Sequence, residues 1–337
     1  MDRFIVGTGR CGSTLLSRML ARNPDVLSIF EYFNGLDVAG RFGAEPMTGD
    51  AFAELIASEQ RVVTAVLRRG YEVSEITYPF HDGPGANPER AGRFGRSDPL
   101  PWILVSMLPR LSDDPDALFD EVMDFCRTLP ERPPVAQHRA LFEWLAGRLG
   151  RPCWVERSGS SIDYLPALVS LFPEARFLHI HRDGHEAALS MREHHAYRLP
   201  IALLYQAADG SGPGMSAVDF EREPTPDDVL SRILAGQPSV AYYGRYWSDQ
   251  VRNGAHAREG LGADRYLEVR FEDLIAKPGD VLAKVARFFA LEPGPWVEDA
   301  SRLVRGTPPP RFASLPEPEQ RLLEEACRPG RALLAQV

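Results

Sequence analysis

The chain has 337 residues, of which 44% are hydrophobic and 25% charged, and its formal net charge is −9. This is the composition of a soluble globular protein with a sizeable core, and its acidic balance argues against general nucleic-acid binding, which depends on basic surface. A local cluster of Arg can nevertheless hold a small anion inside an acidic protein.

The first 35 residues predict a strand, a helix and a second strand. Residues 3–7 form a short apolar run that ends at a glycine, as in a buried strand. Residues 12–22 place leucines on one helical face, and Asn23-Pro24 ends that helix. Residues 26–30 are a second apolar run, which we interpret as another strand.

The pattern changes from about residue 36 to 135. Gly, Pro and Asp become frequent, and helices are predicted only at 51–58 and 116–127, with a loop at 83–99. We interpret this region as a variable helical insertion over one end of a sheet, where it would shape an acceptor site.

Strands resume at 153–156, 176–181 and 266–271, separated by stretches of helical period. Strands that alternate with helices of this length favour an α/β fold with a parallel sheet covered on both faces. Because these strands come from both ends of the chain and must share one sheet, a single domain over 1–337 is expected. The predicted helices are 161–171, 184–195, 238–258, 278–290 and 316–334.

Cysteine usage and hydropathy indicate the compartment. Cys11, Cys126, Cys153 and Cys327 lie far apart and form no C-x-x-C pair, which favours reduced thiols in a cytoplasmic protein. Residues 3–7 already form a core strand, so no signal peptide is expected. No apolar run approaches the roughly 18 residues of a membrane span, so we expect no membrane partner.

A glycine-rich turn joins the first strand to the first helix. The segment from Val6 to Thr14 reads Val-Gly-Thr-Gly-Arg-Cys-Gly-Ser-Thr. Glycines let the backbone approach an anion, and the free N–H groups at the helix start point toward it. Ser13 and Thr14 add hydroxyl donors, and Arg10 supplies a fixed cation where ATPases place lysine. The pattern predicts a phosphate-binding loop.

Three other interpretations of this turn are weaker. A turn that merely joins strand to helix does not account for the Arg and the hydroxyl pair. Gly7, Gly9 and Gly12 have the spacing of the dinucleotide-binding pattern, but no ribose-binding acid follows at a clear second strand. A kinase would need the G-K-[S/T] ending and an acidic strand end for Mg²⁺. The only lysines of this chain are Lys277 and Lys284.

Gly-x-x-Arg-x-Gly-Ser-Thr-Leu-Leu at the start of a helix resembles the 5′-phosphosulfate loop of sulfotransferases that use 3′-phosphoadenosine-5′-phosphosulfate (PAPS), in the branch that includes tyrosylprotein and many bacterial enzymes. The resemblance implies a central parallel sheet like that of P-loop proteins, with PAPS as sulfuryl donor. It also implies a 5′-phosphosulfate site made by Gly9, Arg10, Cys11, Gly12, Ser13 and Thr14.

A second motif resembles the 3′-phosphate site of the same family. Arg182 ends a predicted strand, Asp183 is a good N-cap, and Ser190 follows two turns later. The resemblance assigns Arg182 and Ser190 to the 3′-phosphate, since Arg gives bidentate contacts and Ser a further donor. Related enzymes often carry another Arg where this chain has His194.

Two further residues are assigned to the reaction. Trp154-Val-Glu-Arg157-Ser resembles a family segment whose lysine neutralises the reacting group, so Arg157 joins Arg10 in that role. Glu31 follows the second predicted strand, where the resembling branch places its catalytic Glu, and is the candidate base. Flanking aromatic residues suggest the hypothesis that burial raises its pKa. A solvated Glu at a helix start is the alternative.

The resulting hypothesis is sulfuryl transfer from PAPS to a hydroxyl or amine of a small-molecule acceptor, without a metal. A sugar, a phenol, an alcohol of a secondary metabolite and a peptide tyrosine remain open as acceptors, and the aromatic residues of 76–108 mildly favour a partly apolar molecule. An ATP-dependent kinase and a nucleotide-binding subunit without turnover are the rival functions. A homodimer or a partner protein is left open.

Overall fold

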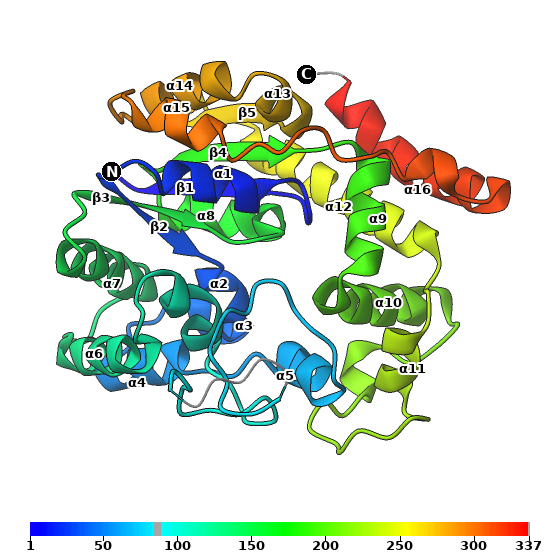
Figure 1. Ribbon diagram of the computed structural model, residues 1–337, viewed down its shortest axis with the longest axis horizontal. Coiled ribbons are helices and arrows are strands. Elements are labelled where there is room, and N and C mark those ends of the chain that lie inside the picture. The colour runs from blue at the N-terminus through cyan, green and yellow to red at the C-terminus, as the bar shows by residue number, and fades with distance from the viewer. Residues whose placement is uncertain (84–88, 336–337) are drawn as a thin grey trace. The chain divides into compact units, whose positions relative to one another are not determined.

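A parallel five-stranded sheet organises the first of two compact parts of the protein (Figure 1). The computed structural model describes residues 1–83 and 89–335. The strand order is β2-β3-β1-β4-β5, and every neighbouring pair is parallel. The predicted α/β fold with a parallel sheet is therefore confirmed. The strands are β1 (Arg3–Gly7), β2 (Val26–Phe30), β3 (Cys153–Arg157), β4 (Arg176–His181) and β5 (Tyr266–Arg270).

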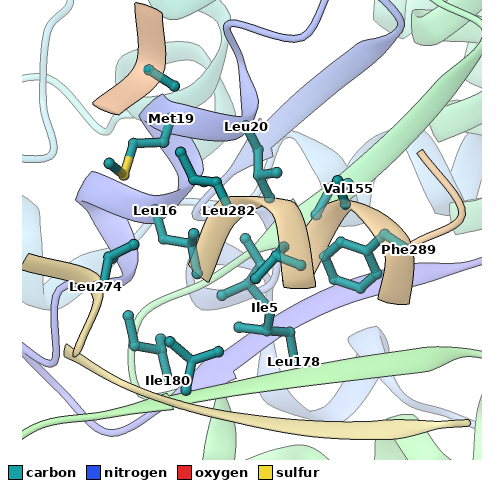
Figure 2. Packing of buried hydrophobic residues seen from close by; sticks show 14 of the residues in the cluster. Ile5, Leu16, Met19, Leu20, Val155, Leu178, Ile180, Leu274, Leu282 and Phe289 are labelled. Atoms are coloured by element: carbon teal, nitrogen blue, oxygen red, sulfur yellow. The ribbon is translucent and has the colours of Figure 1, made fainter. Parts of the chain in front are cut away.

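Alternation along β1 covers the two faces of the sheet differently. Ile5 joins an aliphatic cluster with Leu178 and Ile180 of β4, and Figure 2 shows helical residues such as Leu16 and Leu282 packed against them. Phe4 lies on the opposite face. Its ring centroid is 4.9–5.7 Å from the ring centroids of Trp154, Phe172 and Phe177. Burial on both faces explains why β1 and β2 are largely apolar runs in the sequence.

The chain divides into two compact units. Unit 1 comprises 1–30, 142–190 and 243–337, and unit 2 comprises 31–141 and 191–242. Unit 2 therefore takes in residues 191–242 in addition to the insertion predicted at 36–135. That the whole chain acts as a single domain stays a prediction, as does the placement of the insertion.

The helices of unit 1 connect and cover the strands. They are α1 (Ser13–Leu20), η3 (Ser161–Tyr164), α8 (Leu165–Leu171), α13 (Phe271–Ala276), α14 (Pro278–Phe288), α15 (Trp296–Ser301), η5 (Phe312–Ser314) and α16 (Glu317–Leu334). Three helices contribute to both units: α7 (Pro134–Arg148), α9 (Gly184–Glu193) and α12 (Val240–Arg258).

The described part of unit 2 is built from helices and loops. Its helices are α2 (Tyr32–Gly35), α3 (Val38–Arg41), α4 (Gly49–Ile56), α5 (Arg61–Arg68), η1 (Ile103–Met107), η2 (Leu108–Arg110), α6 (Pro115–Thr128), α10 (His195–Asp209), η4 (Met215–Ala217) and α11 (Val229–Ala235). Part of the loop predicted at 83–99 lies outside the described residues. Among the helices described in the two units, none combines the length and apolarity needed to cross a membrane.

Candidate functional site

The turn between β1 and α1 adopts a conformation that its glycines make accessible. Gly12, the N-cap of α1, has φ of 94°, in the left-handed region that favours glycine. A Cβ at Gly12 would lie 2.2 Å from Cδ2 of Phe271, so this position also needs glycine for close packing. Arg10 has φ of 56°, a sparsely populated conformation for a residue with a side chain.

Gln250 of α12 fastens the start of this loop. Its Oε1 accepts a hydrogen bond from the Gly9 N–H at 2.9 Å, and its Nε2 donates to Oδ2 of Asp163 at 2.9 Å. Tyr246, one turn earlier on α12, donates its hydroxyl to the same Asp163 oxygen at 2.7 Å. The Gly9 amide is thus used within the protein, and the predicted contribution of Gly9 to an anion site rests on its lack of a side chain.

The loop contacts the second motif directly. Arg10 Nε donates a hydrogen bond to Oγ of Ser190 at 3.2 Å, across 180 residues of sequence. The structure therefore brings together two residues that the sequence assigned to different phosphates of one nucleotide. A guanidinium and a hydroxyl in contact form a donor-rich surface suited to an anion.

Arg157 lies beside the same helix start. Its Nη2 donates to Oγ1 of Thr14 at 2.7 Å, and its guanidinium stacks on the Phe30 ring at 4.0 Å from the centroid. The side chain is 1% exposed. A guanidinium that is fixed and buried away from solvent interacts more strongly with a nearby negative charge than one in water.

Arg182 approaches the loop through Phe271. Its guanidinium lies 4.9 Å from the centroid of the Phe271 ring, the ring that packs against Gly12. Burial and the nearby Arg311 lower the pKa of Arg182. Asp183 caps α9 as predicted, its Oδ1 accepting from the N–H groups of His185 and Glu186 at 3.0 and 3.2 Å.

The remaining predicted loop residues differ in what they can offer. Ser13 is 6% exposed and Thr14 is half-buried. Cys11 belongs to the hydrophobic core of the sheet, and burial raises the pKa of its thiol. A role for Cys11 in anion binding would therefore fall to its backbone N–H.

The loop after α15 is attached to the start of α9. Oε1 of Glu186 accepts from the backbone N–H groups of Arg311 and Phe312 at 2.8 and 3.0 Å. His185 stacks on Phe312, with ring centroids 4.1 Å apart, and its Nε2 lies 2.9 Å from a carboxylate oxygen of Glu324. His185 is therefore buried. Arg302 is an exposed surface residue paired to Glu298.

Glu31, the candidate base, is the first residue after β2 and belongs to unit 2. It is 4% exposed and has φ of 55°. Asn34 Nδ2 donates to Glu31 Oε2 at 2.6 Å, and Trp102 Nε1 donates to the Glu31 carbonyl at 2.5 Å. The Asn34 bond holds the carboxylate and the Trp102 bond holds the backbone. Because Glu31 is buried, the alternative of a solvated Glu does not hold.

The candidate histidines His194, His195 and His81 lie in unit 2. His194 is the N-cap of α10, and its Nε2 lies 2.8 Å from Glu75 Oε2 and 3.0 Å from Ser74 Oγ. His195 packs on Tyr71, with ring centroids 4.5 Å apart. His194 is thus enclosed, whereas His81 is exposed in the insertion.

Gln250 and Phe271 are site residues that sequence reasoning missed. Gln250 looks like one polar position in an amphipathic helix, and Phe271 looks like the last apolar residue of the strand predicted at 266–271. A further signal is conformational. Among the described residues, four non-glycines have positive φ, and three of them, Arg10, Glu31 and Ser160, follow closely after β1, β2 and β3. Such strained residues concentrate at functional sites, but none is of a type that betrays this in the sequence.

No protein-family model and no curated protein matches the chain. Among solved structures, it is similar to the sulfotransferase domain from the curacin biosynthetic pathway, with a TM-score of 0.48, 11% identity, and coverage of 99% of this chain and 96% of that one. For the sulfotransferase domain from the Synechococcus PCC 7002 olefin synthase, the TM-score is 0.46 and the identity 17%, with coverage of 99% of this chain and 93% of that one. For mouse sulfotransferase SULT7A1, complexed with PAP, the TM-score is 0.41 and the identity 12%, with coverage of 99% of this chain and 87% of that one.

These TM-scores, all below 0.5, and these low identities do not assign an activity to the chain. The residues of the loop and of the strand ends therefore have to indicate the function. The neighbours named here are all sulfotransferases, the same family that the sequence motifs resemble.

Proposed function

We propose that this protein is a PAPS-dependent sulfotransferase that acts on a small-molecule acceptor. The observation that carries the proposal is the hydrogen bond between Arg10 and Ser190, at 3.2 Å. It unites a phosphate-type loop after β1 with a hydroxyl two turns into the helix after β4. A nucleotide with phosphates at both its 3′ and 5′ positions needs such paired anion sites.

The donor set fits such a nucleotide. Arg10, Arg157 and Arg182 are cations, and Ser13, Thr14 and Ser190 are hydroxyl donors. Oγ1 of Thr8, in the same turn, is buried without a hydrogen-bond partner among the described residues, which marks a polar group that a ligand or water can satisfy. We assign Arg10 and the loop amides to the 5′-phosphosulfate and Arg182 with Ser190 to the 3′-phosphate.

When bound, PAPS supplies an activated sulfuryl group on a phosphate that is already a good leaving group. Negative charge then grows on the oxygen that bridges sulfur and phosphorus. Arg157, held by Thr14 and Phe30, and Arg10, held by Ser190, are cations fixed before the reaction. Such fixed donors stabilise the transition state because they need no reorientation.

Glu31 is proposed as the general base. It takes the proton from the acceptor hydroxyl while the acceptor oxygen bonds to sulfur and the bridging bond breaks. Its hydrogen bond from Asn34 positions the carboxylate, which increases the chance of proton transfer in the reactive geometry.

The Glu31→Gln variant tests the assignment of the base. It keeps the shape and the ability to accept from Asn34, but it cannot take a proton. We expect turnover of PAPS with an acceptor to fall by roughly 10²–10⁴-fold, while the affinity for adenosine 3′,5′-bisphosphate (PAP) is unchanged. The exposed Glu54→Gln is the matched control. A Glu31→Gln rate close to that of Glu54→Gln would show that another group is the base.

A further inference from the structure

Three of the four aromatic residues at 76–108 are buried in unit 2, and the fourth, Phe94, is half-buried. Tyr78, Phe80 and Trp102 are 4–6% exposed and belong to the core of unit 2. Trp102 packs against Gly35 so closely that a Cβ there would lie 1.8 Å from its Cδ1. The sequence hint of a partly apolar acceptor therefore has another explanation, since these rings build the scaffold.

A polar pocket lies close to Glu31 within unit 2. Its volume is about 410 Å³, and its lining comes from two segments, 35–37 and 58–61. Two hydrogen bonds connect it to the proposed base: Gln60 Nε2 donates to the Asn34 carbonyl at 3.0 Å, and Asn34 Nδ2 donates to Glu31 Oε2 at 2.6 Å. Gln60 itself lines the pocket, so the base and the pocket share one network.

Several of the polar groups that line the pocket already have partners. The Ser58 hydroxyl donates to the Leu55 carbonyl at 2.6 Å, and the Gln60 side chain is used at both ends, by Asn34 and by the Val62 N–H. Arg61 points to Glu221, with Nε 3.7 Å from the carboxylate. These groups are therefore poorly placed to bind a ligand.

The charged side chains that line the pocket are two carboxylates, Glu59 and Asp37, and the Arg61 guanidinium, which faces Glu221. Glu59 is half-buried, and its carboxylate has no hydrogen bond or ion pair within the part of the chain that the structure describes. Asp37 adds a second carboxylate, one oxygen of which accepts the Gly40 N–H at 3.2 Å. Because carboxylates only accept hydrogen bonds, a ligand that fits here must donate them.

We propose that this pocket binds the protonated amine of the acceptor, so that the substrate class is an amino alcohol, an amino sugar or a phenol that carries an amine. This inference rests on the proposed function, since it takes Glu31 as the base that faces the reacting hydroxyl. Glu59 is then a specificity-determining residue, with Asp37 in support. A charge-assisted hydrogen bond in a half-buried pocket gives the amine its preference over a neutral analogue.

Matched probes test the inference on the full chain saturated with PAP. Tyramine is compared with 4-ethylphenol, and glucosamine with glucose, and the dissociation constants are measured by protein-observed NMR or calorimetry. We expect the amine to bind about tenfold more tightly than its neutral partner in at least one pair, the gain typical of a hydrogen bond to a charged group. Glu59→Gln should remove that difference, and the exposed Glu54→Gln should keep it.

The outcomes separate this inference from the proposed function. If PAP binds, three results would overturn the amine pocket. They are equal binding of the amine and neutral probes, no binding of any probe, and an unchanged preference for the amine in both Glu59→Gln and Asp37→Asn. Failure of PAP to bind the parent protein would instead count against the sulfotransferase itself. Retained PAP affinity in the two variants shows that they are folded.

Discussion

Replacing Gly12 by alanine tests whether the geometry of the loop, and not only its composition, makes the anion site. Gly12 has φ of 94°, and an added Cβ would lie 2.2 Å from the Phe271 ring. The left-handed backbone costs a side chain about 1–2 kcal/mol, and forcing a methyl group into a packed site costs about 1–3 kcal/mol more. We therefore expect Gly12→Ala to lower the free energy of unfolding by about 2–5 kcal/mol.

The substitution should also weaken nucleotide binding. The Phe271 ring touches both Gly12 and the guanidinium of Arg182, so a displaced ring moves Arg182 as well. The assays are urea unfolding, which reports stability, and calorimetric titration with PAP, which reports the site. Gly260→Ala is the matched control because Gly260 has φ of 87° and no atom within 4 Å of its Cβ position.

Two results would refute this reasoning. If Gly12→Ala and Gly260→Ala lose the same stability, the contact with Phe271 has no energetic weight. If Gly12→Ala binds PAP like the parent, the conformation of this turn does not shape the site. A double-mutant cycle with Phe271→Ala should show coupling of roughly 1 kcal/mol or more, as expected for residues in contact.

Two further predictions concern charge and pH. Arg157→Met should lower kcat by roughly 10²–10³-fold, because it removes a fixed donor to the developing charge. The exposed Arg302→Met is the control and should leave steady-state kinetics unchanged. Equal kcat values for the two variants would exclude Arg157 from the reaction. Burial lowers the pKa of His138 from 6.5 to about 4, so the unfolded chain takes up a proton first as the pH falls. Stability is then lost between pH 6.5 and 4, by up to about 3 kcal/mol, and urea unfolding of His138→Gln should lack this part of the pH dependence; an identical pH profile would contradict it.

The strands could be predicted from sequence because the sheet is buried on both faces. Residues 3–7, 26–30 and 176–181 are apolar runs with clear stops, and the structure has strands at the same bounds. Helices were harder to predict. The predicted helix 184–195 ends at Glu193, since His194 has extended backbone dihedrals and starts a new helix. That helix, α10, carries Pro200 in its interior, a residue that argues against a helix in sequence.

The candidate site was predictable where chemistry follows a strand directly. Arg157 ends β3, Arg182 follows β4, and Arg10 lies in the turn after β1, so strand ends locate all three. Gln250 was not predictable because its role depends on a tertiary contact with the Gly9 amide. The left-handed backbone at Arg10 and Glu31 was equally hidden, because tertiary packing rather than residue type holds it.

Calorimetric titration with PAP, beside ATP with Mg²⁺, tests the central claim most directly. We expect PAP to bind more tightly than ATP with Mg²⁺. Arg182→Ala should lose most of this preference, while the surface variant Arg302→Ala keeps it. A preference for ATP with Mg²⁺ would favour a kinase. Binding of neither nucleotide would contradict the account and leave the loop after β1 as a structural turn.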